Sequence, residues 1–165
     1  MVAAEKGYTA VVRALFEQGA NLHAKDPDRG RTALHLAAAN GHTDTVQALL
    51  ERGADAQAKD ARGSALLLEM VQQGRTAIVQ LLLTHGADVH AQEKGGDTAL
   101  MVAAKEGQTT TLEVLLDRGA SVHTQDRSGF TVLMSAAERA IQPLCKPCST
   151  VGPTSMRDTR VAGQP

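Results

Sequence analysis

The tripeptide Gly-Ala-polar recurs four times along the chain, at intervals of 34, 33 and 33 residues. Its copies are Gly19-Ala20-Asn21, Gly53-Ala54-Asp55, Gly86-Ala87-Asp88 and Gly119-Ala120-Ser121. Two further glycine columns keep this register, one 12 residues before each copy (Gly7, Gly41, Gly74, Gly107) and one 23 residues before the last three (Gly30, Gly63, Gly96). Such a fixed period predicts a solenoid of stacked units, each of which buries its apolar side against a neighbour.

The stretch that ends at each tripeptide has apolar residues at helical spacing. In the second unit they are Val46, Leu49 and Leu50, at positions i, i+3 and i+4, which share one face of a helix. The other units repeat the pattern with Val12, Leu15 and Phe16, with Val79, Leu82 and Leu83, and with Leu112, Leu115 and Leu116. A threonine precedes each stretch (Thr9, Thr43, Thr76, Thr109), and we expect its hydroxyl to cap the helix. The glycine of the tripeptide is expected to end the helix.

A shorter, alanine-rich helix is predicted ahead of each of these. It opens at Thr32, Thr98 or Thr131 and contains small residues, such as Ala37 and Ala38, that let helices of adjacent units approach closely. The segments between units, such as 59–63, carry Asp and Gly and are typical of turns. The sequence therefore predicts paired helices joined by turns.

Composition excludes several classes of partner. The 165 residues include 17 Lys and Arg against 18 Asp and Glu, so a net charge of −1 gives no strong field toward nucleic acid. Aromatic residues make up 2% of the chain, too few for base-stacking platforms, and no apolar run approaches the roughly 18 residues that span a bilayer. We expect no nucleic-acid or membrane partner. The first residues lack a secretory pattern and only two cysteines occur, so a cytoplasmic or nuclear location is expected.

The second unit resembles the ankyrin repeat almost letter for letter. The resemblance is carried by Thr32-Ala33-Leu34-His35-Leu36-Ala37-Ala38, Asn40-Gly41-His42, Val46 to Leu50 and Gly53-Ala54-Asp55. It extends over about Met1 to Ala140 and implies an all-α, ankyrin-type solenoid of helix pairs with hairpin-like tips. It also implies that the protein binds other proteins, through a concave groove formed by the tips and the exposed side of each first helix.

The repeat divides the chain into units of about 1–26, 27–60, 61–93, 94–126 and a partial unit 127–140. Met1-Val2-Ala3-Ala4 aligns with Met101-Val102-Ala103-Ala104, so the chain is expected to start at the first helix of a unit. Residues 141–165 contain four of the five prolines and both cysteines, and we expect them to form an irregular or disordered tail. Incomplete terminal units would each leave an apolar patch exposed.

The chain departs from the ankyrin pattern in three respects. The third unit has Met70-Val71 where the family has alanines, and overpacking of this kind typically costs about 1–3 kcal/mol. Pro27 lies in a turn lengthened by one residue, which explains the interval of 34. The family histidine of the first helix is present only as His35; its equivalents include Leu68 and Met101.

Two groups of residues resemble metal or redox sites. His23, His90 and His123 form a column with Gln57, but stacked helices lie about 8–10 Å apart whereas zinc–nitrogen bonds are about 2.0–2.1 Å long. We therefore expect this column to bond local backbone. Cys145 and Cys148 form a C-x-x-C without a βαβ context or a second ligand pair, and are expected to be inert. No motif of nucleophilic, phosphate-binding or metal-dependent catalysis is present, so we expect neither enzymatic activity nor a cofactor or metal.

The residues left for binding are those that the repeat does not need for packing. By resemblance they are Arg29, Arg62 and Lys94 at the tips; Arg31, Ser64, Asp97 and Phe130 just after the tip glycine; and Asn40, Gln72, Gln73, Lys105 and Glu106 on the first helices. The basic tips suit an acidic or amphipathic segment. Phe130 stands in a column of polar residues, where it is either a binding anchor or a cover for the last unit.

The sequence thus predicts a non-catalytic protein–protein interaction module, acting as scaffold, adaptor or inhibitor. One alternative is a truncated isoform without a competent groove, which associates with itself or with a longer ankyrin array. Another is a targeting or regulatory module of a longer enzyme.

Overall fold

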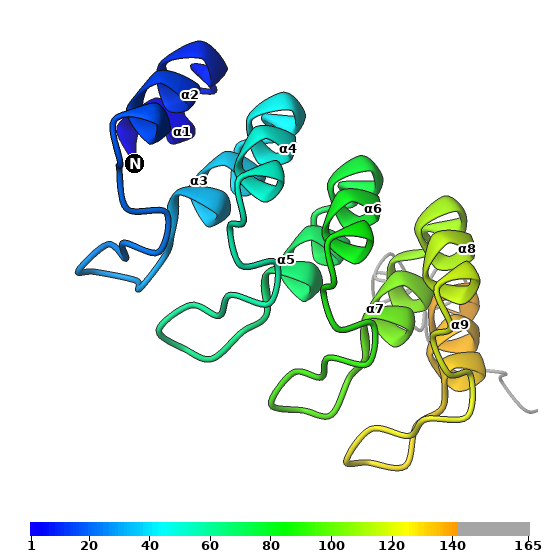
Figure 1. The fold of residues 1–165 in the computed structure, drawn as a ribbon. Coiled ribbons are helices and arrows are strands. Elements are labelled where there is room, and N and C mark those ends of the chain that lie inside the picture. Colours follow the sequence, from blue (N-terminus) through cyan, green and yellow to red (C-terminus); the bar gives the residue numbers. More distant parts are fainter. Residues whose placement is uncertain (142–165) are drawn as a thin grey trace, which may run out of the picture.

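The computed structural model describes residues 1–141, which form nine helices in two layers (Figure 1). The helices are α1 (Val2–Glu5), α2 (Thr9–Glu17), α3 (Ala33–Ala39), α4 (Thr43–Glu51), α5 (Leu66–Gln72), α6 (Thr76–Thr84), α7 (Ala99–Glu106), α8 (Thr109–Asp117) and α9 (Val132–Ile141). Within this part of the chain the extended backbone is limited to isolated bridges, which join Lys59 to Ala65, Gln92 to Thr98 and Gln125 to Thr131. The predicted all-α architecture is confirmed.

The two layers follow from the repeat. The first helices α1, α3, α5, α7 and α9 pack in sequence on one another, and so do the second helices α2, α4, α6 and α8. Each complete unit also packs its own pair together, as α3 does with α4. The loops that link the units project to one side of the stack (Figure 1). No helix among the described residues has the length and hydropathy needed to cross a bilayer.

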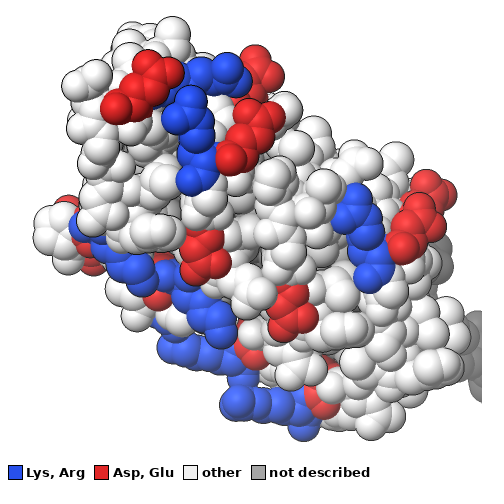
Figure 2. Space-filling view, viewed as in Figure 1, with Lys and Arg blue, Asp and Glu red and all other residues white. Residues whose placement is uncertain are grey.

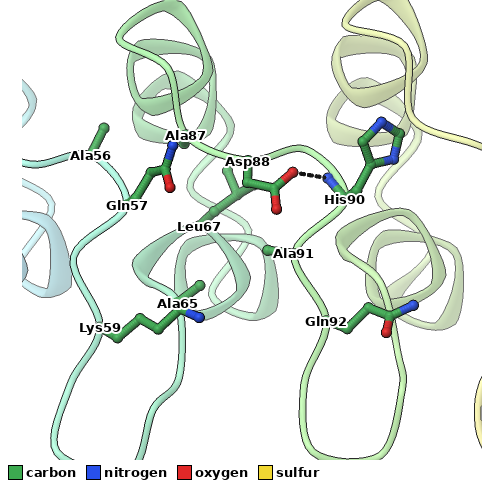
Figure 3. Close-up of a pocket in the computed structure, with 10 residues that line it drawn as sticks. All are labelled: Ala56, Gln57, Lys59, Ala65, Leu67, Ala87, Asp88, His90, Ala91 and Gln92. Atoms are coloured by element: carbon green, nitrogen blue, oxygen red, sulfur yellow. Dashed lines mark hydrogen bonds between the residues drawn. The ribbon is translucent and has the colours of Figure 1, made fainter.

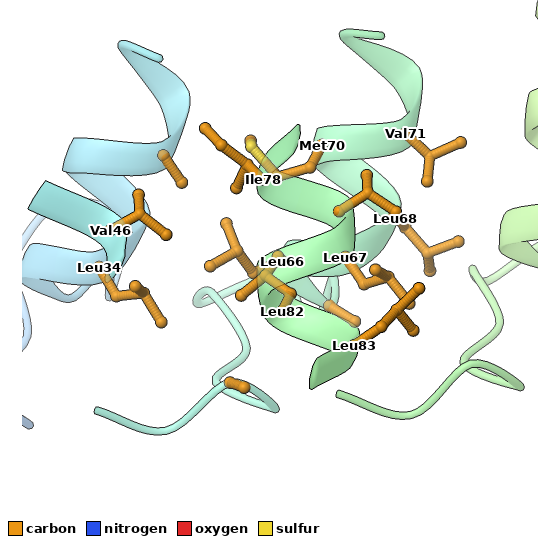
Figure 4. Packing of buried hydrophobic residues seen from close by; sticks show 14 of the residues in the cluster. Leu34, Val46, Leu66, Leu67, Leu68, Met70, Val71, Ile78, Leu82 and Leu83 are labelled. Atoms are coloured by element: carbon orange, nitrogen blue, oxygen red, sulfur yellow. The ribbon is translucent and has the colours of Figure 1, made fainter. Parts of the chain in front are cut away.

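The core runs through the middle of the stack (Figure 4). The predicted apolar face of α4 is fully buried, with Val46 and Leu49 at 0% exposure, and the same is true of Leu82 in α6. In α2 and α8 the face is only partly covered: Leu15 is 48% exposed and Leu116 is 38% exposed. These two helices have a neighbour in their layer on one side only within the described residues.

The helix-opening threonines behave differently in the two layers. In the first helices they cap as predicted, since the Thr98 hydroxyl accepts the Met101 amide at 3.3 Å. The expectation for the second helices was wrong: Thr9, Thr43, Thr76 and Thr109 are each the first helical residue, and no side chain caps α2, α4, α6 or α8. A capping side chain must come from the non-helical residue before the helix.

Two of these threonines join neighbouring units instead. The Thr9 hydroxyl lies 2.7 Å from that of Thr45, and the Thr76 hydroxyl lies 2.7 Å from that of Thr111. Thr45 and Thr111 are completely buried, so these contacts satisfy hydroxyl groups that water does not reach. Thr9 and Thr76 therefore connect neighbouring units rather than cap the helices that begin with them.

The residues before α4, α6 and α8 each donate a side-chain hydrogen bond to a backbone carbonyl of the preceding unit. His42 Nε2 donates to the Glu5 carbonyl at 2.9 Å, and Arg75 Nη2 donates to the Ala39 carbonyl at 2.8 Å. Gln108 Nε2 does the same to Val71 at 2.7 Å. These carbonyls lie at the ends of α1, α3 and α5, where helical backbone lacks intrahelical partners. We call this set of bonds the inter-unit clamp.

Glycine makes the clamp possible. Gly7 and Gly41 have φ of 73° and 77°, which favours glycine on backbone grounds alone. A Cβ at Gly7 would also lie against the His42 imidazole, and one at Gly41 would fall on the Arg75 guanidinium. The glycine column thus ends the first helix and leaves room for the side chain that closes it.

The bulky third unit is accommodated inside the stack. Met70 and Val71 are both 0% exposed, and α5 lies between the alanine-rich helices α3 and α7. The last helix, α9, includes Ile141, one residue beyond the predicted boundary at residue 140. Cys145, Cys148 and the rest of the predicted tail lie outside the described residues.

Met70→Ala is expected to destabilise the fold rather than relieve overpacking. Because the side chain is fully buried, its removal leaves a cavity and should lower the free energy of unfolding by about 2–5 kcal/mol. Urea denaturation measures this, with Gln80→Ala on the exposed surface of α6 as a control that stays within about 0.5 kcal/mol of the parent. A gain in stability for Met70→Ala would show that the third unit is overpacked.

His35 is expected to make stability depend on pH. It is 1% exposed, its Nδ1 accepts the Thr32 amide at 3.2 Å, and burial lowers its pKa below the ordinary value of 6.5. The unfolded chain protonates near pH 6.5 while the folded chain stays neutral. The free energy of unfolding should therefore fall as pH drops below about 6.5 and be retained above it.

Urea denaturation at neutral and mildly acidic pH tests the role of His35. His35→Leu, which copies Leu68 of the next unit, should lose this part of the pH dependence. His90→Gln, at an exposed histidine, should keep it. An undiminished acid-dependent loss in His35→Leu would contradict the assignment.

Candidate protein-binding surface

Four short loops, which we call the tips, form the projecting edge of the molecule. They are residues 26–31, 60–64, 93–97 and 126–130, and in each the first amide donates to the last carbonyl, at 2.8, 3.2, 3.0 and 3.0 Å respectively. The first tip has one residue more than the others and contains Pro27, which confirms the predicted lengthening. Each tip has a glycine of positive φ, for example Gly63 at 79°.

A carboxylate folds back into three of the tips. Asp60 Oδ1 accepts the amides of Arg62 and Ser64, both at 2.9 Å. Asp26 and Asp126 do the same in their own tips. The amide of Arg29, aided by those of Arg31 and Gly30, holds the pKa of the Asp26 carboxyl below its usual value. These carboxylates therefore bind backbone amides of their own loops.

Neighbouring tips are bonded to one another in pairs. The Ala61 amide donates to the Arg29 carbonyl at 2.8 Å, and the Arg127 amide donates to the Gly95 carbonyl at 3.1 Å. Glycine is required at both contacts, because a Cβ at Gly30 would lie 3.0 Å from the Ala61 nitrogen and one at Gly96 would lie 2.9 Å from the Arg127 nitrogen. The first tip is thus fixed against the second, and the third against the fourth.

A cleft of about 210 Å³ lies between the second and third tips, where no such bond joins the tips (Figure 3). Its walls are the stems of the two loops: one carries Gln57 and Lys59, and the next carries Asp88 and His90. Leu67 of α5 contributes an apolar patch to the lining. The cleft has room for part of a partner side chain between polar walls.

The predicted tip cations are exposed. Arg29, Arg62 and Lys94 all face solvent, and among the described side chains, those of residues 1–137, their charged groups have no hydrogen-bond or ion-pair partner. Figure 2 shows Lys and Arg side chains in a row along the lower left edge, where Figure 1 places the tips.

Other predicted residues are engaged within the protein. Arg31 Nη2 pairs with Glu69 of α5 at 3.0 Å, and Lys105 Nζ pairs with Asp97 at 2.8 Å. These ion pairs join residues of the tips to residues of the first helices α5 and α7. The side chains of both ion pairs are half-buried, with exposures of 20–33%.

The remaining predicted residues have different surroundings. Gln72 Nε2 donates to Glu93, Gln73 bonds Glu69 and Arg75, and Asn40 Nδ2 donates to the Leu36 carbonyl at 2.8 Å. Ser64 and Glu106 are exposed. Phe130 is 40% exposed at the end of the fourth tip, so a large part of its ring faces solvent.

Sequence reasoning missed Glu69, Glu93, Arg75 and Arg127 on this surface. Glu69 is the one charged residue in the apolar run from Leu66 to Val71, and this interruption is the sequence signal that could have identified it as a surface residue. Arg127 is the cation of the fourth tip, one column away from Arg29 and Arg62. No sequence signal identifies the partners of Glu93 and Arg75, because Gln72 and Ala39 lie 21 and 36 positions away along the chain.

The histidine column does not bond as expected. The backbone amide of His90 donates to Asp88 at 2.9 Å, and His23 does likewise with Asn21, whereas the imidazoles are exposed. Only Gln57 uses its side chain, which donates to the Gly86 carbonyl of the next unit. The expectation was therefore wrong for the imidazoles, because the local hydrogen bonds are made by the backbone amides of His23 and His90 and not by their rings. Within residues 1–141 no three His, Cys, Asp or Glu side chains are grouped as a metal site would require.

Asp60→Ala is expected to loosen the second tip. It removes the acceptor of two backbone amides, and the free energy of unfolding should fall by about 1 kcal/mol. Urea denaturation measures the loss, and hydrogen exchange should quicken at the Arg62 and Ser64 amides. Asp28→Ala, at an exposed tip aspartate, serves as the matched control and should change neither quantity. Equal effects of the two substitutions would contradict the role of Asp60.

Comparison with known families agrees with this geometry. A family model described as ankyrin repeats (3 copies) matches residues 1–60 and 67–147. Among proteins of curated function, none matches the chain. Ankyrin repeats are generally protein–protein interaction modules. Since the family model covers most of the chain and the helix pairs stack as the repeat requires, the chain belongs to the ankyrin repeat family.

Proposed function

We propose that this chain is a non-catalytic protein-binding module that engages a polypeptide through the tips and the adjoining first helices. The observation that carries the proposal is the row of exposed, unpartnered cations at tips whose backbones are bonded in two pairs, the first to the second and the third to the fourth. A surface that is rigid before binding loses little conformational freedom on association. Scaffold, adaptor and inhibitor are all compatible with such a surface.

Site-directed photo-crosslinking tests this function. A benzophenone residue replaces Ser64 on the second tip in one sample and Gln80 on the exposed side of α6 in the other. In cell extract the Ser64 position should yield discrete crosslinked proteins that Gln80 does not. Equal crosslinking from both positions would refute a binding surface at the tips.

Self-association is a second candidate, favoured by an apolar face on α9. Leu133 is 80% exposed and Met134 is 53% exposed, and Leu133 lines a hollow with Leu112, Val122 and Val132. Exposed apolar surface of this kind is typical of interfaces. Sedimentation velocity distinguishes the two candidates: concentration-dependent dimers that disappear in Leu133→Ser would support self-association, and a monomer at all concentrations would refute it.

A further inference from the structure

The cleft between the second and third tips lies where one column of the repeat has its smallest side chain. Ala56 lies three residues after the glycine of the Gly-Ala-polar tripeptide and lines the cleft. Its equivalents in the other units are Leu22, Val89 and Val122. Leu22 and Val89 are half-buried and pack against the core, so a branched aliphatic side chain occupies this position on either side of the cleft. At Ala56 that volume is left open.

A second column departs from the repeat at the same place. The residue before the first helix is Ala65, where the neighbouring units have Thr32 and Thr98. Ala65 is buried and also lines the cleft, together with Leu67 and with Ala91 of the next unit (Figure 3). The cleft therefore results from two positions at which this chain departs from its own repeat.

The same interval lacks the hydrogen bond that joins the other tips. Elsewhere the second residue of a tip donates its amide to a carbonyl of the preceding tip, as Ala61 does to Arg29. The equivalent groups here are the Lys94 amide and the Arg62 carbonyl, and within residues 1–141 neither has a hydrogen-bond partner. The stems that line the cleft lead directly into these two tips. A free donor and a free acceptor therefore lie at its tip end.

The lining favours an aliphatic side chain. A cavity of about 150 Å³ accommodates benzene, so a cleft of about 210 Å³ has room for a leucine-sized group. Two polar side chains of the walls are already bonded within the protein: Gln57 Nε2 donates to the Gly86 carbonyl at 3.1 Å, and Asp88 Oδ1 accepts the His90 amide at 2.9 Å. The repeat itself indicates the group that fits, because Leu22 packs against the core at the equivalent position of the first unit.

We infer that this cleft binds one leucine-like side chain of an extended partner segment, whose backbone pairs with the Arg62 carbonyl and the Lys94 amide. In recognition of extended peptides, main-chain hydrogen bonds give affinity and side-chain pockets give specificity. The inference rests on the proposed protein-binding function and names the anchor that the partner supplies.

NMR titration of the nitrogen-15-labelled full chain tests the inference. The probe is N-acetyl-leucine methylamide, and N-acetyl-alanine methylamide is the control with the same two amide groups. The leucine probe should shift the amide resonances of Ala56, Ala91 and Lys94 to saturation. Its Kd should be at least about tenfold lower than that of the control, since burial of a leucine side chain contributes that much. Equal shifts from the two probes, or shifts from neither, would overturn the inference.

Charged probes test the other occupants that the walls could take. N-acetyl-glutamate methylamide could pair with Lys59, and N-acetyl-lysine methylamide could pair with Asp88. Both should bind more weakly than the leucine probe, whose binding should change little with salt because the contact is apolar. Tighter binding of either charged probe would overturn the inference in favour of a charged anchor.

Filling the cleft from within locates the contact. Ala56→Leu copies Leu22 and should weaken binding of the leucine probe by at least about tenfold. Ala10→Leu makes the same change on the exposed surface of α2 and should leave binding unaltered. Ala65→Thr, which copies Thr32, should also weaken binding and decides the test if Ala56→Leu does not fold. Undiminished binding in the folded cleft variant, or an equal loss in Ala10→Leu, would overturn the inference.

The crosslinking experiment separates this inference from the proposed function. Introducing Ala56→Leu into the sample with benzophenone at position 64 should reduce its discrete crosslinks, because the cleft no longer admits the anchor of the partner. Crosslinks that persist undiminished in Ala56→Leu would refute the leucine anchor alone. Absence of position-specific crosslinks in the parent would refute the proposed function itself.

Discussion

The backbone at the ends of α1, α3 and α5 is completed by a side chain from the next unit. Arg75 does this for α3 through the Ala39 carbonyl, and His42 and Gln108 do it for α1 and α5. At Gly7 and Gly41 this side chain lies where a Cβ would be, so glycine leaves room for it. The helices that begin after His42 and Arg75 bury Val46, Leu49 and Leu82 completely.

The stability of each unit consequently depends on the units that pack against it. The middle helices α4 and α6 are covered on both sides of their layer and bury their apolar faces, whereas Leu15 and Leu116 of α2 and α8 remain exposed. The same nearest-neighbour arrangement positions the tips, because each tip lies between the helices of two successive units.

Local features of the sequence predicted most of the fold. The glycine columns and the i, i+3, i+4 spacing of Val46, Leu49 and Leu50 located the second helices, because these signals act within one unit. Contacts between units were not predictable in the same way. Thr76 looks like a cap in sequence but bonds Thr111 of the next unit, and the pairing of Arg31 with Glu69 joins residues 38 positions apart. Three of the four tip cations, Arg29, Arg62 and Lys94, were predicted by position, but the inward bonding of Asp60 needed the loop geometry.

The clamp is tested most directly by comparing Gly41→Ala with Gly53→Ala in urea denaturation. Both glycines have positive φ, 77° and 86°, so both variants incur similar backbone strain of about 1–2 kcal/mol. A Cβ at Gly41 meets the Arg75 guanidinium, whereas one at Gly53 meets nothing within 4 Å. The clamp predicts a larger loss for Gly41→Ala, and a smaller cost of Arg75→Ala in that background than in the parent. Equal losses at the two glycines, with additive effects of Arg75→Ala, would contradict it.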